Sequence, residues 1–283
     1  MVEVLKEGFY DSIQDLGRFG YQQYGVPVSG VMDTYAATFA NSLLGNEVKE
    51  AVMEITMTGP KLKFHCHTTF CISGANLSPC LNNMPIKMNQ IVRVTDGDML
   101  SFGKHMDGLR SYLAVFGGFQ TEIIYQSKSM YQGITNHFKI NKNDLLSISE
   151  NTAFFNKKHA SIKRNDSYLN TKVISVFKGP EFDQLSENQI KALFSKEFSI
   201  SKHHNRMAYQ LEQPLENHLE PIITSLVMPG TVQLTPDGKL IVLMRDCQTT
   251  GGYPRIFQLE ESSMNVLSQK FTGQTIRFKW VQP

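Results

Sequence analysis

Short runs in which apolar and polar residues alternate recur along the chain and predict β-strands. Three of them are residues 61–64, 91–95 and 275–280. Gly, Asn or Asp separates many such runs, as expected for strands joined by tight turns. The apolar run 111–119 has the length of a buried strand and is too short to span a membrane. The pattern therefore predicts a protein built mainly from strands.

The clearest hairpin joins residues 231–235 to residues 240–244. Between the two runs lie Pro236, Asp237 and Gly238. Proline presets one backbone dihedral of a turn and glycine readily adopts positive φ, so the chain is predicted to reverse direction here.

Helical periodicity is confined to three segments. Asp33 is placed to cap the first helix, which is predicted to run to Leu44 and to end before a glycine. Ser186 and Gln189 have the spacing of a capping box at the start of the second helix. A third, short helix is predicted after Ser262.

A polar stretch divides the sequence. Residues 151–171 are rich in Asn, Lys, Ser and His and have no apolar periodicity, so a domain boundary is predicted there. The predicted domains are 1–160 and 172–283. The five residues that begin at Arg18 are echoed by the five that begin at Arg206, which supports two related halves. Both halves are predicted to be β-barrels, because a closed barrel leaves no exposed sheet edge.

The charge balance and the cysteines exclude several classes of function. Lys and Arg total 28 against 26 Asp and Glu, so the net charge of +2 lacks the basic excess of a nucleic-acid-binding protein. The densest basic stretch, 157–164, is interpreted as a solvated linker. The start of the chain does not resemble a signal peptide, and the four cysteines show no C-x-x-C spacing. We expect reduced thiols and a cytoplasmic protein with no nucleic-acid or membrane partner.

Several familiar motifs are missing. The chain has no P-loop and no G-x-S-x-G elbow, so any ATP site here is of another kind. Histidines occur in residues 65–67 and 203–204, but adjacent strand residues point to opposite faces, so no metal site is expected. The sequence around Lys87 matches a biotin-attachment site poorly, so no covalent biotin is expected on this chain.

A glycine-rich segment near the start carries an unusual set of polar residues. They are Gln14, Asp15, Arg18, Ser29 and Asp33. The glycines among them permit tight turns and close backbone approach, and the polar groups can bind a ligand. An Arg–Asp pair that only fixes the loop is the alternative, and both interpretations stay open.

A second polar segment, 245–254, directly follows the hairpin. Its hydroxyls and backbone amides beside two glycines could form an anion-binding nest for phosphate or carboxylate. A wide β-turn is the alternative. We favour ligand binding because charged, hydroxyl and glycine residues coincide at a strand end. The residues concerned are Asp246, Thr249, Thr250, Gly251, Gly252 and Tyr253.

Six motifs occur in order along the chain. They are Gln14-Asp-Leu-Gly-Arg18, Gly25-Val-Pro-x-Ser29-Gly-x-Met-Asp33, Arg110-x-Tyr-Leu-Ala-Val-x-Gly-Gly118, Asn205-Arg206-Met-x-Tyr209, Pro229-Gly-x-x-Gln233 and Thr249-Thr-Gly-Gly-Tyr-Pro254. Together they resemble one known family, that of the C component of bacterial 5-oxoprolinase. It is also described as allophanate hydrolase subunit 2, biotin-dependent carboxyltransferase-like or KipA.

The resemblance implies a mainly β fold with a few helices, in two cyclophilin-like β-barrel domains. It implies that two partners, a KipI-like B component and an A component, act with this chain to open 5-oxo-L-proline to L-glutamate at the expense of ATP, with Mg²⁺. Two other functions stay open. One is an allophanate or urea amidolyase-type hydrolase subunit, and the other is a non-catalytic, KipA-like regulator that binds a kinase inhibitor.

The same resemblance implies roles for individual residues. Opening a lactam through phosphorylation of its oxygen needs cationic or amide donors and a base for water. The expected bases are Asp15, Asp33 and Asp246. The expected ligand-binding residues are Gln14, Arg18, Ser29, Arg110, Arg206, Tyr209, Gln233, Thr249, Thr250, Gly251, Gly252 and Tyr253.

The chain departs from the family's usual motifs in two places. Residues 126–130 read Gln-Ser-Lys-Ser-Met where the family usually has Gly-Ser-Arg-Ser-Thr. Ala208 and Gln210 stand where the family usually has Gly and Arg. The roles of the 126–130 loop and of position 210 therefore stay open.

Overall fold

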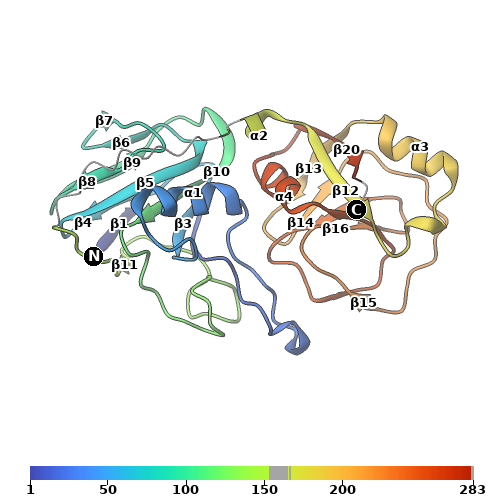
Figure 1. Cartoon of the computed structure of the whole chain (residues 1–283), viewed down its shortest axis with the longest axis horizontal. Helices are drawn as coiled ribbons and strands as arrows, with labels where there is room; N and C mark the ends of the chain where they lie inside the picture. The colour runs from blue at the N-terminus through green and yellow to red at the C-terminus, as the bar shows by residue number, and fades with distance from the viewer. Residues whose placement is uncertain (153–164, 166, 282–283) are drawn as a thin grey trace. The chain divides into compact units, whose positions relative to one another are not determined.

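The computed structural model describes residues 1–152, 165 and 167–281 and divides into two compact units (Figure 1). The first unit comprises Met1–Arg18 and Asp33–Leu169, and the second comprises Phe19–Met32 and Asn170–Pro283. The segment Phe19–Met32 thus packs with the second unit, although it lies within the first predicted domain. The domain boundaries themselves stay a prediction, and the basic stretch 157–164 lies outside the described residues.

Two antiparallel sheets form the first unit. One has the strand order β11-β1-β4-β9-β6-β7, and the other has the order β2-β3-β10-β5-β8. The strands are β1 (Val2–Lys6), β2 (Tyr10–Gln14), β3 (Val52–Thr56), β4 (Lys61–Phe64), β5 (Thr68–Asn76), β6 (Pro79–Leu81), β7 (Met84–Pro85), β8 (Val92–Val94), β9 (Met99–Phe102), β10 (Asp107–Val115) and β11 (Leu145–Leu146).

One helix, α1 (Thr34–Leu44), packs against β5 and β10 of the five-stranded sheet (Figure 1). Asp33 caps it, because its carboxylate accepts a hydrogen bond of 2.9 Å from the Ala36 amide. It ends at Gly45, which has φ of 74°. The predicted first helix is confirmed at both ends. Because α1 covers one face of β5 and β10 and the core lies against the other, these two strands are buried almost throughout.

A closed barrel forms the centre of the second unit, in the strand order β12-β19-β16-β17-β14-β13-β20. The parallel pairing of β12 with β20 closes it. Its strands are β12 (Val173–Lys178), β13 (Phe198–His204), β14 (Ala208–Leu211), β16 (Thr231–Leu234), β17 (Leu240–Leu243), β19 (Arg255–Leu259) and β20 (Thr275–Trp280). The predicted hairpin is the β16–β17 pair, with Gly238 in its turn at φ of 79°.

Short elements surround the barrel. α3 (Glu187–Ser195) begins with the predicted capping box of Ser186 and Gln189, and α4 (Glu261–Ser268) is the predicted third helix. A two-stranded ribbon pairs β15 (Ser225–Leu226) with β18 (Thr250–Gly251). The remaining short helices in the described part of the chain are η1 (Gln22–Tyr24), η2 (Phe182–Gln184) and α2 (Ser167–Asn170), and none of the three was predicted.

The predicted fold class, mainly β with a few helices, is confirmed, and the predicted closed barrel is found in the second unit. The strands of the first unit form two sheets instead of one closed barrel. The proposed echo of Arg18 and Arg206 is not a structural repeat. After Arg18 the chain enters an irregular loop and η1, whereas after Arg206 it enters β14. Every helix in the described part of the chain is too short or too polar to cross a bilayer.

Candidate functional site

The Asp15 carboxylate holds a loop of the first unit in place. It accepts hydrogen bonds from the hydroxyls of Ser127 (2.7 Å) and Ser129 (2.6 Å). It also accepts from the backbone amides of Lys128 (2.6 Å) and Gly17 (2.8 Å). Four donors satisfy both oxygens of a carboxylate, so the geometry of Asp15 is that of a loop anchor.

Arg18 also contacts this loop. The guanidinium is buried, donates to the Ser129 carbonyl oxygen and lies 3.5 Å from the Ile124 carbonyl oxygen. Gln14 is also buried and donates 3.1 Å to the carbonyl oxygen of Met130. Three of the predicted site residues therefore converge on one loop, and their role in binding a ligand stays a prediction.

Side chains in this loop alternate between two environments. Those of Ser127 and Ser129 bond to Asp15, whereas those of Lys128 and Met130 line a pocket. The two serines match the family's usual motif, and the two pocket residues depart from it. The anchor thus sets the position of a pocket wall whose chemistry differs from the family's usual one.

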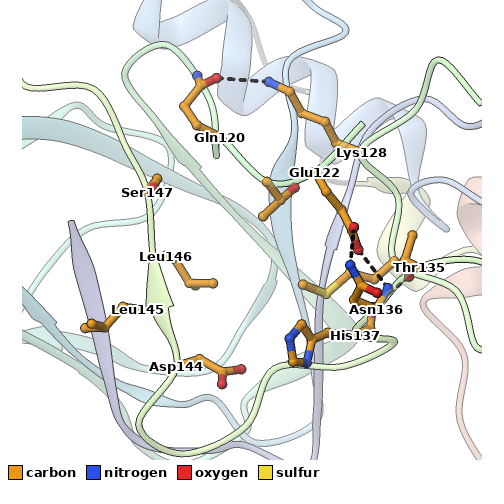
Figure 2. Close-up of a pocket in the computed structure, with 12 residues that line it drawn as sticks. Gln120, Glu122, Lys128, Thr135, Asn136, His137, Asp144, Leu145, Leu146 and Ser147 are labelled. Atoms are coloured by element: carbon orange, nitrogen blue, oxygen red, sulfur yellow. Dashed lines mark hydrogen bonds between the residues drawn. The ribbon is translucent and has the colours of Figure 1, made fainter. Parts of the chain in front are cut away.

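This first-unit pocket has a volume of about 380 Å³ and lies in the irregular region between β10 and β11 (Figure 2). None of the predicted site residues lines it. Most of the segments that line the pocket show no periodic pattern in the sequence. The unusual 126–130 loop was the one sequence feature that could have indicated it. The lining residues are Gln120, Thr121, Glu122, Lys128, Met130, Thr135, Asn136, His137, Asp144, Leu145, Leu146 and Ser147.

Hydrogen bonds tie the pocket walls together. Both carboxylate oxygens of Glu122 accept from Asn136, at 2.8 Å from its backbone amide and 2.7 Å from its side-chain amide. The Lys128 ammonium lies 3.3 Å from the Gln120 side-chain oxygen and 3.5 Å from a Glu50 oxygen. Figure 2 shows the Glu122–Asn136 and Lys128–Gln120 contacts on adjoining walls.

A buried polar network lies beneath α1. Tyr112 donates 2.9 Å to Glu54 and accepts 2.8 Å from the Asp33 amide, and Tyr168 donates 2.7 Å to the Asp33 carboxylate. Arg110 lies 3.6 Å from Glu54. Burial, together with the Glu54 carboxylate, raises the pKa of Tyr112 well above its usual value, so its hydroxyl stays a donor. Both Asp33 oxygens are therefore engaged, one by the helix cap and one by Tyr168.

An ion pair anchors a loop of the second unit. Arg206 donates to both oxygens of Asp246, at 2.8 and 3.0 Å, and 2.6 Å to the Gly30 carbonyl oxygen. The Ser29 hydroxyl donates 2.7 Å to the same carboxylate. The guanidinium is buried, and the fork of two parallel bonds fixes its orientation. Here too, predicted site residues assemble into a loop anchor.

The segment predicted to form an anion nest is part of the β15–β18 ribbon. Gly251 and Gly252 both lack positive φ, so the alternating backbone of a nest is absent and that expectation is wrong. Thr250 and Tyr253 are exposed, and Thr249 is half-buried. Ligand binding by Thr249–Tyr253 stays a prediction.

Gln233 and Tyr209 are both buried in the barrel. Gln233 lies against the ribbon, since a Cβ added to Gly251 would come within 2.5 Å of its side-chain nitrogen. Among the described residues this nitrogen has no hydrogen-bond acceptor. The ring of Tyr209 packs on that of His204 with centroids 5.0 Å apart. Their predicted ligand contacts stay predictions.

A second pocket, of about 370 Å³, lies at the β13–β14 turn of the second unit. Ala208 and Gln210 line it, so the family departures again fall on a pocket wall. His203 and His204 both border it although both lie in β13, whose pairing with β14 has a register shift between Ile200 and His204. Within the described residues no group of three or more His, Cys, Asp or Glu side chains could hold a metal ion.

Sequence reasoning missed one unusual acid in the first unit. Burial raises the pKa of Asp11 from its ordinary 3.8 to about 7. Its carboxylate accepts 2.8 Å from the Gly8 amide, and its other oxygen has no donor among the described residues. The sequence feature that could have identified it is an aspartate within a strand segment that contains no Lys or Arg.

Two units of this kind, one with paired sheets and one with a closed barrel, define a carboxyltransferase-type fold. A solved chain of Kluyveromyces lactis urea amidolyase shares it with a TM-score of 0.88 and 29% identity over 99% of this chain. A solved protein designated TTHA0988 shares it with a TM-score of 0.86 and 25% identity over 98% of this chain.

The chain belongs to the family described as carboxyltransferase domain, subdomain A and B, whose model matches residues 24–280. Among curated proteins it is 30% identical to the C component of 5-oxoprolinase from Escherichia coli (strain K12), over 98% of this chain and 90% of that protein. It spans only 55% of the TTHA0988 chain and 19% of the urea amidolyase chain. The predicted family is therefore confirmed.

Proposed function

We propose that this chain is one subunit of an ATP-dependent enzyme that opens 5-oxo-L-proline to L-glutamate. The observation that carries the proposal is its similarity, over nearly the full length of both proteins, to the E. coli 5-oxoprolinase C component. The name of that protein describes it as one subunit among several, so the activity is proposed for a complex of this chain with a B component and an A component.

The proposed reaction requires activation before water attacks. A five-membered lactam is a poor electrophile, and transfer of a phosphoryl group from ATP to its carbonyl oxygen makes the carbonyl carbon more electrophilic. Water adds to this carbon, the C–N bond breaks as the nitrogen takes up a proton, and a second water releases phosphate from the acyl phosphate to leave the carboxylate. Donors must then stabilise the charge that develops, and a base must accept a proton from water. In the proposed division of labour, this chain binds and orients the lactam.

The carboxylates predicted as bases fit a Mg²⁺ site poorly. Asp15 accepts four hydrogen bonds within the first unit, both oxygens of Asp33 accept one there, and Asp246 is paired with Arg206. A magnesium ion prefers carboxylate oxygens that carry no competing cation. We therefore propose that residues of the partner proteins contribute to holding ATP and Mg²⁺.

Exposed apolar side chains on the second unit support a partner. Ile223, Leu226, Met228 and Tyr253 are all exposed and belong to the β15–β18 ribbon or its flanks. Backbone bonds of the ribbon, such as the 2.9 Å bond from Ile222 to Gly252, bring these flanks together. An apolar surface of this kind is typical of an interface between proteins.

Co-purification and assay test the proposal. The chain, mixed with candidate B and A components, should hydrolyse ATP when 5-oxo-L-proline is added and should form L-glutamate. Stimulation by urea or allophanate, without stimulation by 5-oxo-L-proline, would instead favour the amidolyase-type function that the urea amidolyase similarity suggests. A stable complex without turnover of any of the three would favour a KipA-like regulator.

A substitution on the ribbon tests the partner surface. Leu226→Asp should abolish co-purification with the B component, because a charge at the centre of an apolar interface leaves an unpaired carboxylate there. Val48→Asp, at an exposed apolar position of the first unit, is the matched control and should leave the complex intact. Normal assembly of the Leu226→Asp protein would place the interface elsewhere.

A further inference from the structure

The first-unit pocket is built on a fixed frame. Asp15 holds both sides of residue 128 through Ser127 and Ser129 and accepts from the Lys128 amide itself. On the adjoining wall, Glu122 accepts two hydrogen bonds from Asn136. A pocket whose walls are already held by hydrogen bonds loses little conformational entropy when a ligand binds.

The cation of this pocket retains the capacity to bind an anion. The Lys128 side chain is only 17% exposed, and its nearest acceptors lie 3.3 and 3.5 Å away. Charge-assisted hydrogen bonds are usually about 2.7–2.9 Å long, so these contacts are loose. A ligand carboxylate at the usual distance would satisfy the ammonium better than its present partners do.

The other polar groups of the pocket suit an amide. The hydroxyl oxygen of Thr121 is buried and has no partner among the described residues. Asp144 accepts one bond from the Asn141 amide, at 2.7 Å, and can accept a further N–H. Glu122 offers less, because both its oxygens are already engaged.

An apolar floor completes the pocket. The side chains of Leu146 and Met130 are buried and form part of its lining. Figure 2 shows Leu146 and His137 pointing into the same space from different walls. Apolar atoms beside a few fixed polar groups are typical of small-molecule sites.

From this arrangement we infer that the first-unit pocket binds a small carboxylate that also carries an amide. The Lys128 ammonium takes the carboxylate, Thr121 and Asp144 take the amide, and Leu146 and Met130 contact the carbon skeleton. The choice of 5-oxo-L-proline as the first ligand to test rests on the proposed function. Allophanate has the same two groups, so the experiment distinguishes the two sources.

Direct binding to the purified full chain tests the site. The 13 methionines are labelled at the methyl carbon, and the signal of Met130 is identified by its loss in Met130→Leu. Addition of 5-oxo-L-proline should shift the Met130 signal and leave that of Met264, buried in the second unit, unchanged. The pocket lies within one unit of this chain, so binding should occur without the B component.

Substitution of the cation gives the sharper result. Lys128→Gln should weaken binding at least tenfold, the loss expected when a charge-assisted bond of about 1.5–3 kcal/mol is removed. Lys128→Arg should retain most of the affinity. The melting temperature should stay close to wild type in both variants, because the anchor uses the backbone amide of residue 128 rather than its side chain.

A matched control is available in the same unit. Lys49 is an exposed lysine that pairs with Glu47 at 3.1 Å, and Lys49→Gln should leave binding unchanged. Equal loss of affinity in Lys49→Gln and Lys128→Gln would overturn the assignment of Lys128, as would full affinity in Lys128→Gln.

The outcomes separate this site from the proposed function. Binding of allophanate but not of 5-oxo-L-proline would uphold the site and contradict the proposed function. Binding of 5-oxo-L-proline in this pocket, without ATP hydrolysis by the assembled complex, would also uphold the site and contradict the proposed function. A Met130 signal that neither ligand moves would overturn the site, even if the complex were active on 5-oxo-L-proline.

Discussion

The two units fix their loops with the same two residue types in different ways. In the second unit, Arg206 and Asp246 pair directly through two bonds of 2.8 and 3.0 Å. In the first unit, Asp15 accepts only from amides and hydroxyls, and Arg18 donates to the Ser129 carbonyl oxygen. In the second unit, the carboxylate is paired with a guanidinium. In the first unit, each charged group is stabilised by several neutral hydrogen-bonding groups.

The contrast indicates where the stability of each anchor resides. Loss of one member of a buried ion pair leaves the other charge without compensation, so the effect is concentrated in a single residue. A carboxylate with four donors distributes its contribution over four bonds, and no single donor is decisive. In both units, residues that match the family's motif form the anchor. The departures at Lys128 and Met130, and those at Ala208 and Gln210, line the neighbouring pocket.

The largest effect is expected at the ion pair. Asp246→Ala leaves the buried Arg206 without its carboxylate and should lower the free energy of unfolding by about 3–5 kcal/mol. Urea denaturation measures the loss. The double variant Arg206→Met/Asp246→Leu should recover much of it, because no unpaired charge then remains. A loss below about 1 kcal/mol in the single variant would contradict the pair's role as an anchor.

A smaller loss is expected at the first-unit anchor. Asp15→Ala removes four acceptor contacts but leaves no uncompensated charge among the donors, and it should cost about 2–3 kcal/mol. Asp15→Asn is the control. Its side-chain carbonyl oxygen can still accept some of the four hydrogen bonds, so the loss of unfolding free energy should be about half that of Asp15→Ala. Equal losses in both variants would show that charge, rather than the number of bonds, sets the strength of this anchor.

A third acid extends the comparison to a carboxylate with a single donor. Because the pKa of Asp11 is about 7 in the folded protein and 3.8 ordinarily, the folded state binds its proton more tightly. The resulting stability is complete below about pH 4 and is lost as the pH rises through 7. Between pH 5 and pH 6.5, the free energy of unfolding should fall by about 2 kcal/mol more in the wild type than in Asp11→Asn.

Urea denaturation of both proteins at the two pH values measures this difference. The other titrating groups are common to both proteins and cancel in the comparison. Identical pH dependence in wild type and Asp11→Asn would show that Asp11 is ionised in the folded protein.

The smallest effects are expected at the two serines that bond to the anchors. Ser127 donates to Asp15 and Ser29 donates to Asp246, each at 2.7 Å. Ser127→Ala and Ser29→Ala should each cost about 1 kcal/mol, because the remaining donors still satisfy the carboxylate. Thermal denaturation of the pair measures the two losses, and a much larger loss in Ser29→Ala would show that Arg206 alone does not satisfy Asp246.

Local signals in the sequence predicted elements that depend on neighbouring residues. The capping of α1 by Asp33, the capping box of α3 and the turn at Gly238 are all confirmed. The nest predicted for residues 249–253 is wrong, because pairing with β15 extends this segment as a strand. A motif of hydroxyls and glycines is compatible with either conformation, and a distant strand decides between them.

The candidate site shows the same limit more strongly. The sequence identified Asp15 and Arg18 as candidate site residues. It could not show that both form hydrogen bonds with a loop more than 100 residues away along the chain. It also could not show the pocket, whose walls come from irregular segments without periodicity. The alternation of side chains in the 126–130 loop connects the marked residues to that pocket.

The family, the mainly β fold and the ends of the principal helices could all be inferred from the sequence, because motifs, alternation and capping are properties of neighbouring residues. Which polar residues became anchors and which faced a pocket depended on the three-dimensional fold. The packing of Phe19–Met32 with the second unit depended on it as well. These outcomes arise from contacts between segments far apart along the chain, and local preferences carry no information about which distant donor or acceptor a side chain will meet.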